Sequence, residues 1–245
     1  MENVGQSHTR NKEYEKRFSR EQLLQNLVKF SEPIIFDVGA HRGESVSFLK
    51  RIFPSASIYS FEPDPDSYKE LSSFNVARVC YFNLAISDSD GTASFYRNKI
   101  SHTNSLLKVN LKSKDSISIA KATEVNDTQF FEGFNEEVKV ISVRLDSFTY
   151  SNSIDHIDLL KIDVQGAECR VLNGAIETLK KTKVIIIEIG FFDYYENQTS
   201  FMDIESIIFP LGYRLFSISE ISNNPMNGRT DWAEVVYLNQ NIIKQ

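Results

Sequence analysis

The chain has 245 residues, of which 41% are hydrophobic and 24% charged, and these values fit one α/β domain with a full core. A net charge of −6 and the lack of a long lysine or arginine block argue against nucleic acid as the main partner. Two cysteines are too few for a disulfide framework or an iron–sulfur cluster. No apolar signal region or membrane-length segment is visible, so we expect a cytoplasmic protein without a membrane span.

The amino-terminal residues differ in character from the rest of the chain. Residues 1–18 are predicted to be a polar tail, of which about the first ten are expected to lack order. The run Ser19-Arg20-Glu21-Gln22 forms a capping box between the hydrophobic residues Phe18 and Leu23, so a helix should begin at about Ser19 and end before Pro33. Residues 19–245 are predicted to form a single domain.

From residue 34 onward, apolar runs and helical patterns alternate. Fully apolar strands separated by helices indicate a parallel sheet with helices on both faces, and the last two strands must pair antiparallel because no helix joins them. The expected strands are Ile34–Val38, Ser57–Glu62, Val79–Ile86, Thr92–Arg97 as part of a hairpin, Val138–Leu145, Ile157–Asp163, Val184–Ile189, Tyr213–Ile218 and Ala233–Leu238. The expected helices are Glu44–Phe53, Pro65–Phe74, Ala167–Lys180 and about Ser200–Phe209.

One long segment breaks this alternation. Residues 98–137 are polar, rich in Ser, Lys and Asn, and show no clear period. Long irregular segments inside compact domains are usually functional or disordered. We therefore predict that residues 98–137 form an insertion or mobile lid on the substrate side of the site.

The first strand ends in the most informative motif. Asp37 closes the apolar run, and the turn Gly39-Ala40-His41-Arg42-Gly43 opens a helix. About twenty-five residues later Glu62 closes the next strand, where a carboxylate can bind ribose hydroxyls in a βαβ nucleotide fold. Asp37 would repel a pyrophosphate but would favour a nucleoside with a cationic amino-acid tail. S-adenosylmethionine is such a molecule, whereas a nicotinamide dinucleotide is disfavoured.

Other polar groups should gather at the same sheet edge, because ligands bind outside the carboxyl ends of parallel strands. Asp163 and Glu188 end two later strands, Lys161 precedes Asp163 on the same strand face, and Glu168 lies in a first helical turn. Asp163 is the favoured group for orienting or deprotonating a hydroxyl. A divalent metal such as Mg²⁺ at Asp163 and Glu188 is a weaker alternative, because two acids form only a thin coordination shell.

Two histidines lie near these motifs. His41 is inside the glycine turn and is expected to pack beside the cofactor. His102 lies in the irregular segment, and histidine is the usual base near neutral pH, so His102 is the alternative base to Asp163. A solvated loop histidine without a role is the competing interpretation of His102.

Together these residues resemble the FkbM-type family of class I S-adenosylmethionine-dependent methyltransferases. The matching runs are Phe36–Gly43, Phe61-Glu62-Pro63, Asn83–Ser87 with Gly91, Asn104-Ser105-Leu106, Val143–Asp146 and Leu160–Glu168. The resemblance implies a Rossmann-like sheet of about seven strands, mostly parallel with an antiparallel last strand, and methyl transfer usually to oxygen. Family substrates are often sugar or natural-product hydroxyls. The chain departs from the family pattern at His41, where Asn is common, and at Gln165, where Glu is common.

The resemblance also assigns roles. Asp37, Gly39 and Gly43 would hold the methionine part of the cofactor, Glu62 its ribose, and Asn83 to Ser87 its adenine side. We predict an O-methyltransferase acting on a hydroxyl of a small molecule or glycan, and the rival hypothesis is an inactive scaffold that keeps the cofactor fold. The oligomeric state stays open. The complete candidate set is Asp163 and His102 for catalysis; Asp37, Gly39, Ala40, His41, Gly43, Glu62, Pro63, Asn83, Ala85 and Ser87 for the cofactor; and Asn104, Ser105 and Glu188 on the substrate side.

Overall fold

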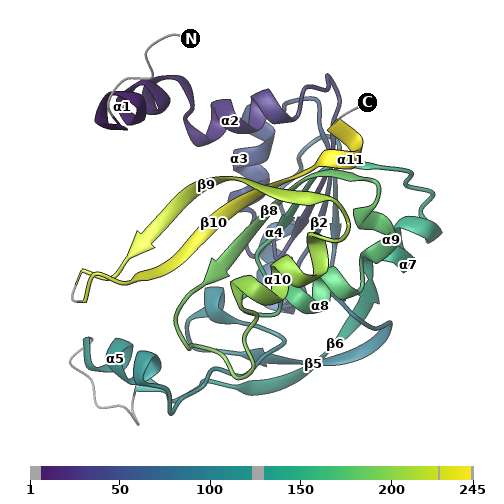
Figure 1. The fold of residues 1–245 in the computed structure, drawn as a ribbon. Coiled ribbons are helices and arrows are strands. Elements are labelled where there is room, and N and C mark those ends of the chain that lie inside the picture. Colours follow the sequence, from purple (N-terminus) through teal and green to yellow (C-terminus); the bar gives the residue numbers. More distant parts are fainter. Residues whose placement is uncertain (1–6, 123–129, 226, 244–245) are drawn as a thin grey trace.

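The protein is built on a seven-stranded sheet. The computed structural model describes residues 7–122, 130–225 and 227–243. Five parallel strands are followed by β10, which runs antiparallel to both of its neighbours. This arrangement confirms the predicted sheet with its reversed last strand (Figure 1). In spatial order the strands are β3 (Val79–Phe82), β2 (Ser57–Phe61), β1 (Ile34–Val38), β7 (Ile157–Ile162), β8 (Thr182–Gly190), β10 (Thr230–Asn239) and β9 (Tyr213–Asn223).

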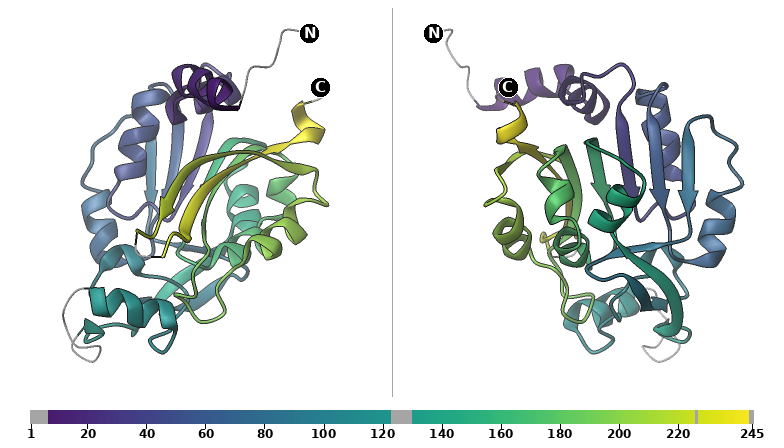
Figure 2. Two further views of the ribbon diagram at one scale, coloured as in Figure 1. Left: turned by 60° about the vertical axis from the view of Figure 1, so that its left-hand side comes forward. Right: turned by 90° about the vertical axis from the view of Figure 1, so that its right-hand side faces the viewer.

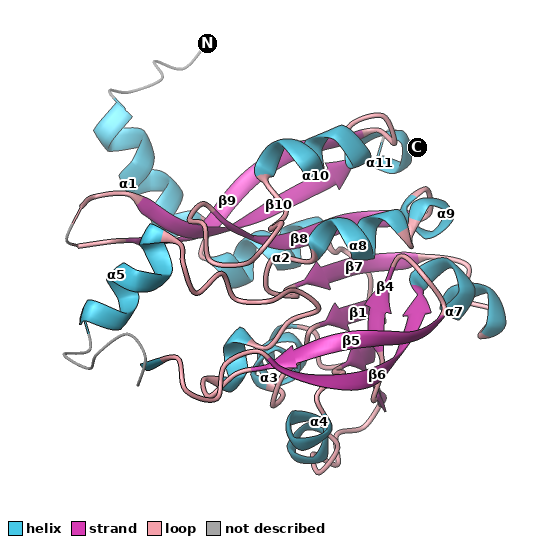
Figure 3. Ribbon diagram, turned by 90° about the horizontal axis from the view of Figure 1, so that it is seen from below, coloured by secondary structure: helices cyan, strands magenta, loops and turns pink. Residues whose placement is uncertain are grey.

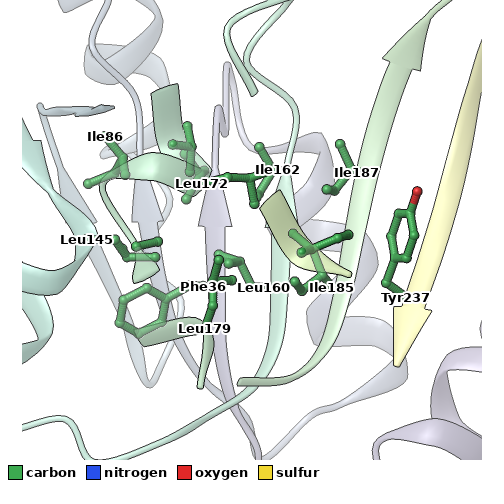
Figure 4. Packing of buried hydrophobic residues seen from close by; sticks show 14 of the residues in the cluster. Phe36, Ile86, Leu145, Leu160, Ile162, Leu172, Leu179, Ile185, Ile187 and Tyr237 are labelled. Carbon is green, nitrogen blue, oxygen red and sulfur yellow. The ribbon is translucent and has the colours of Figure 1, made fainter. Parts of the chain in front are cut away.

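Helices cover both faces because successive strand residues point to opposite sides. On one face, α2 (Arg20–Leu27) and α3 (Glu44–Ile52) pack on residues such as Ile35 and Leu159. On the other face, Phe36 and Leu160 belong to the larger core, which Figure 4 shows between strands and helices. The helices of that face are α7 (Leu145–Ser151), α8 (Glu168–Asn173), α9 (Ile176–Leu179) and α10 (Phe201–Ile208), and α4 (Pro65–Leu71) lies beside β3.

Local sequence signals fix several helix starts. Ser19 caps α2 and Ser200 caps α10, each in a reciprocal capping box. The predicted helix start at Ser19 is therefore confirmed. Four helices among the described residues were not expected: α1 (Ser7–Arg17), which lies in the predicted polar tail, α5 (Lys114–Ala122), α7 and α11 (Gln240–Ile243). The sequence of α1 has no apolar stripe from which a helix could be predicted. In the structure, the Tyr14 hydroxyl of this helix lies 3.3 Å from Ser217 Oγ on β9. Within the described ranges, none of the helices has the length and apolar character needed to cross a membrane.

A second, three-stranded sheet corrects two predictions. The expected strand Val79–Ile86 is divided into β3 and β4 (Ala85–Ser87), and Asn83 at the break donates to the carbonyl oxygens of Glu62 and Pro63 at 2.8 and 3.0 Å. The expected hairpin is also wrong, because β6 (Glu136–Arg144) pairs parallel with β4 and antiparallel with β5 (Gly91–Arg97) and so separates them. Figure 3 shows this small sheet on the side of the molecule nearest the viewer.

The segment between β5 and β6 contains a 3₁₀ turn, η1 (Ser101–Thr103), and a helix, α5 (Lys114–Ala122). Residues 123–129, which the predicted lid includes, lie outside the described residues. The first part of the segment is held by side-chain hydrogen bonds: the backbone N–H of Asn98 donates to Asn104 at 2.7 Å, and Asn135 bonds both backbone groups of Val109. Figure 2 shows α5 at the end of the molecule opposite the two termini.

The expected long helix Ala167–Lys180 is divided into α8 and α9 at Gly174. A Cβ on Gly174 would lie 1.9 Å from the carbonyl oxygen of Ser87, so the helix approaches the β4 backbone too closely for any other residue. Asp146 then caps the second helix through the backbone N–H groups of Glu177 and Thr178. A non-local contact, which the sequence pattern does not reveal, sets this break.

We expect Gly174→Ala to destabilise the fold. The clash with backbone forces helix and sheet apart, and overpacking of this kind costs about 1–3 kcal/mol. The melting temperature should fall by about 2–4 °C per kcal/mol. Asn173→Ala, at the exposed neighbouring position, is the control and should leave the melting temperature within about 1 °C. Equal melting temperatures for the two variants would contradict the close approach.

Candidate functional site

A cavity of about 460 Å³ opens at the carboxyl ends of β1, β2 and β7. Its size falls in the range of small-molecule sites, and its position is where parallel α/β sheets bind ligands. The walls come from the glycine turn after β1, the ends of β2 and β7, the β3–β4 connection, the segment after β5, and helices α2 and α3. The lining includes Arg20, Gly39, Ala40, His41, Phe48, Glu62, Pro63, Leu84, Ala85, Ser101, His102, Asn104, Lys161, Asp163 and Gln165.

The glycine turn brings main chain close to main chain. Gly39 has φ +86°, and a Cβ there would lie 1.8 Å from the carbonyl oxygen of Asp163. The N–H groups of Gly39 and Ala40 both donate to the Phe61 carbonyl at 3.0 Å, so the turn is tied to the end of β2. Gly43 begins α3 at φ +97°. The turn therefore joins the ends of three neighbouring strands at the cavity floor.

Asp37 lies beneath this turn and does not line the cavity. Its Oδ2 accepts from Ser45 at 2.6 Å and from Ser60 at 3.1 Å, while Oδ1 is buried and has no hydrogen-bond partner among the described residues. Burial raises the pKa of Asp37, although the charge of Lys161 opposes this shift. This oxygen is closed to the cavity, so Asp37 can act on a bound cation through its charge but not by direct contact.

Glu62 lines the cavity with its carboxylate fixed by backbone. Oε2 accepts from the His41 N–H and Oε1 from the Asp64 N–H, both at 2.8 Å. Burial raises the pKa of Glu62 to about 7, against the lowering effect of these two backbone donors. Each carboxylate oxygen can accept a second hydrogen bond, so Glu62 retains capacity for two ligand hydroxyls.

The next part of the wall is apolar. Pro63, Leu84, Ala85, Ile86 and Phe95 line it, and they provide flat contact area of the kind a purine ring needs. Of the residues predicted for this side, Asn83 and Ser87 do not reach the cavity. Asn83 instead fixes the chain after β2, and Ser87 is buried in β4.

A row of charged and amide groups closes the cavity at the ends of β7 and β8. Lys161 Nζ donates to Asp163 Oδ2 at 3.0 Å and forms an ion pair with it. Burial alone would raise the pKa of Asp163. The charge of Lys161, together with the hydrogen bonds that Lys161 and Gln165 donate to Asp163, lowers this pKa overall. Glu188 lies behind this pair, outside the cavity lining, where Gln165 Nε2 donates to its Oε1 at 3.2 Å.

The segment after β5 forms the opposite wall. Ser101, His102 and Asn104 line the cavity, with the His102 side chain exposed at its mouth. His41 Nε2 and Ser101 Oγ share a hydrogen bond at 3.0 Å, and burial lowers the pKa of His41. Ser105 does not reach the cavity, because its hydroxyl donates to the Gln165 carbonyl at 2.7 Å.

Two lining residues carry no motif and were not predicted. The guanidinium of Arg20 lies 4.3 Å from the ring centroid of Phe48, and its Nε donates to Glu234 Oε1 at 2.9 Å. Helices α2 and α3 bring these side chains over the site, and this packing cannot be read from either helix alone. A polar residue at the start of a capped helix is the only local signal at Arg20.

The structure therefore brings together nine of the predicted residues and leaves six outside the cavity. Within the described ranges no group of three or more His, Cys, Asp or Glu side chains could hold a metal ion. The residues that line the cavity are Gly39, Ala40, His41, Glu62, Pro63, Ala85, His102, Asn104 and Asp163. The residues outside are Asp37, Gly43, Asn83, Ser87, Ser105 and Glu188.

Comparison with known proteins places this geometry in context. Residues 37–215 match the model of the methyltransferase FkbM domain. The 2-O-methyltransferase NoeI of Sinorhizobium fredii is 30% identical over 176 residues, covering 71% of this chain and 70% of that protein. The hexuronic acid methyltransferase AglP of Haloferax volcanii is 26% identical over 161 residues, and the match covers 64% of this chain and 56% of AglP. This chain thus spans less than two thirds of AglP.

A solved structure agrees at the level of the fold. The crystal structure of methyltransferase FkbM from Methylobacillus flagellatus superimposes with a TM-score of 0.51 and 13% sequence identity. The match covers 85% of this chain and 44% of that chain. At this identity the likeness concerns the fold alone.

Proposed function

Because this chain belongs to the FkbM methyltransferase family, we propose that it transfers the methyl group of S-adenosylmethionine to a hydroxyl oxygen of a sugar, glycan or natural-product intermediate. The observation that carries the proposal is Glu62, which lines the cavity with both oxygens fixed by backbone donors. A carboxylate held in this way at the end of β2 is suited to a pair of ribose hydroxyls. The name of NoeI, a 2-O-methyltransferase, supports transfer to oxygen, and that of AglP, a hexuronic acid methyltransferase, supports a sugar acid as the acceptor.

The residues present fit this cofactor. The apolar wall at Pro63, Leu84 and Ala85 would hold the adenine, and Glu62 the ribose. The glycine turn at Gly39 would border the methionine part, and the charge of Asp37 beneath the turn would favour its cationic group. Bound there, S-adenosylmethionine would supply an electrophilic methyl group on a sulfonium.

The remaining walls would receive the acceptor. Ser101, His102 and Asn104 line the same cavity as the Arg20–Phe48 pair. Methyl transfer is an in-line displacement, so most of the catalysis is alignment of the hydroxyl with the methyl group. We propose that Asp163, held ionised by Lys161, orients the acceptor hydroxyl and accepts its proton, with His102 as the alternative base.

Calorimetry with S-adenosylmethionine and its demethylated product tests the cofactor assignment. We expect dissociation constants in the micromolar range for both ligands. Methyl transfer is then measured with a panel of sugars, nucleotide sugars and hydroxylated metabolites. Binding without transfer to any acceptor would favour the scaffold hypothesis, and no binding at millimolar ligand would overturn the cofactor and the enzyme together.

A further inference from the structure

We propose that Gln165 is a positioning residue, whose carboxamide bridges the carboxylates of Asp163 and Glu188 and holds Asp163 in the ionised, oriented form. Nε2 donates to Asp163 Oδ1 at 2.9 Å and to Glu188 Oε1 at 3.2 Å. Both amide hydrogens are therefore used on two acids that end neighbouring strands. Gln165 also lines the cavity beside Asp163, so the bridge lies at the reacting end of the site.

The main chain at Gln165 is held in an unusual conformation. Its φ of +55° is rare for a residue with a side chain, and such strain persists only where surrounding contacts fix it. Here the Ser105 hydroxyl donates to the Gln165 carbonyl at 2.7 Å and approaches the Val164 carbonyl at 3.3 Å. The segment after β5 thus fastens the turn that presents the carboxamide to the two acids.

The direction of the carboxamide is fixed as well. The Tyr195 hydroxyl lies 3.1 Å from Gln165 Oε1 and 3.1 Å from the Thr103 carbonyl oxygen, so its one hydrogen is shared between two acceptors. Burial raises the pKa of Tyr195 well above its ordinary value, so this hydroxyl stays a donor. The reversed amide would direct its oxygen at Asp163 and Glu188, which is unfavourable beside an ionised acid. The two acids therefore determine that the donors face them, and the Tyr195 hydroxyl contributes to this orientation.

The charges around the bridge explain why a neutral donor is needed. Burial, and then the charge of Asp163, raise the pKa of Glu188 to about 8. Gln165 lowers the pKa of both acids by hydrogen bonding, and Lys161 supplies the only positive charge within hydrogen-bond distance among the described residues. The charged or titratable groups that face this network from the surrounding elements are Asp37, His41, Lys161, Glu168, Tyr194, Tyr195 and Glu234.

The inference rests on the proposed function in one respect, namely that the ionised Asp163 acts on the acceptor hydroxyl. Its test therefore includes a measurement that needs no acceptor. The carboxyl carbon of Asp163 is observed by NMR in protein labelled at aspartate, with Asp163→Asn identifying the signal. Its titration is followed in the wild type, Gln165→Met, Gln165→Glu and Tyr195→Phe.

We expect Gln165→Met to raise the titration midpoint of Asp163 by at least one pH unit, because an anion in a buried site loses a donor. Gln165→Glu should raise it further, since a third acid replaces the donor, and Tyr195→Phe should raise it by less. Gln198→Met is the matched control: Gln198 also lies beside Tyr195 but donates to the Gly190 carbonyl, so the midpoint should not move. Because Gln165→Glu and Tyr195→Phe keep the side-chain shape, they remain informative if the methionine variant does not fold.

Once an acceptor is known, the same variants should shift the acid limb of the kcat profile to higher pH by the same amount. The dissociation constant for S-adenosylmethionine should stay within about threefold, and failure of that binding in the wild type would count against the proposed function alone. A titration midpoint unchanged within 0.3 pH units (about a twofold change in the ionisation constant) in all three variants would overturn the bridge. A uniform loss of activity without a shifted profile would likewise assign Gln165 a purely structural role.

Discussion

Asp163→Asn should lower the turnover number for methyl transfer by about 10²–10⁴-fold, the range for loss of a positioned general base. Asparagine keeps the shape and can accept a hydrogen bond from Lys161, but it cannot take a proton. Cofactor affinity should stay within about threefold, because asparagine has nearly the same shape as aspartate and leaves the walls of the cavity in place. The measurement is kcat across the pH range, with calorimetry for the cofactor.

Two controls sharpen this result. Asp158→Asn makes the same substitution in β7 at the end remote from the cavity, where Asp158 accepts from the Ile34 N–H, and it should leave kcat unchanged. His102→Ala removes the alternative base. If His102→Ala loses turnover and Asp163→Asn keeps it, the roles are reversed, and wild-type turnover in both variants would refute the proton-transfer mechanism.

Glu62→Ala should weaken binding of S-adenosylmethionine by at least tenfold. The carboxylate would make two charge-assisted hydrogen bonds to ribose, worth about 1.5–3 kcal/mol each, and tenfold in affinity corresponds to about 1.4 kcal/mol. Glu168→Gln is the matched control, because Glu168 is also buried, its pKa is also raised to about 7 by burial, and it accepts the Gly166 N–H outside the cavity. Equal affinity in Glu62→Ala and wild type would show that the end of β2 does not bind ribose.

The raised pKa of Glu62 gives this prediction a pH dependence. With a folded pKa of about 7 against an ordinary 4.5, the folded apo protein holds a proton that the unfolded chain has lost between these values. Stability of the apo protein should therefore fall as pH rises through this window, and Glu62→Gln should remove that contribution. Affinity for the cofactor should instead rise with pH through about 7, because the ionised carboxylate is the better acceptor. Denaturant titrations and calorimetry at pH 5, 6, 7 and 8 measure both trends.

The parts of the fold that follow local rules were predictable. The bounds of β1 agree with the sequence pattern to the residue, and Ser19 and Asp37 lie where capping and strand-end signals place them. The predictions of strand pairing fail where a segment distant in the sequence determines the partner of a strand. β5 pairs with β6 because residues 136–144 return between it and β4, and no pattern near residue 90 indicates that return.

The same distinction applies to the site. Glu62 and Gly39 belong to contiguous motifs, and the structure brings both to the cavity. Arg20 and Phe48 come from two helices whose packing depends on the whole sheet, so no local pattern placed them at the cavity. Gln165 was visible only as a departure from a family pattern, and its contacts with Asp163, Glu188 and Tyr195 come from three elements.

The pairing of β5 with β6 has a consequence for how new specificities could arise. Residues 98–135 are the connection of an antiparallel strand pair whose two ends are fixed beside each other by the register of Arg97 with Glu136. Doubling the length of a closed connection costs only about 0.6 kcal/mol, so the length of this segment can change at small cost outside Leu106, Leu107 and Val109, which are buried in the core. If this segment forms the proposed acceptor wall, changes of length outside its buried residues are a low-cost route to a new acceptor specificity.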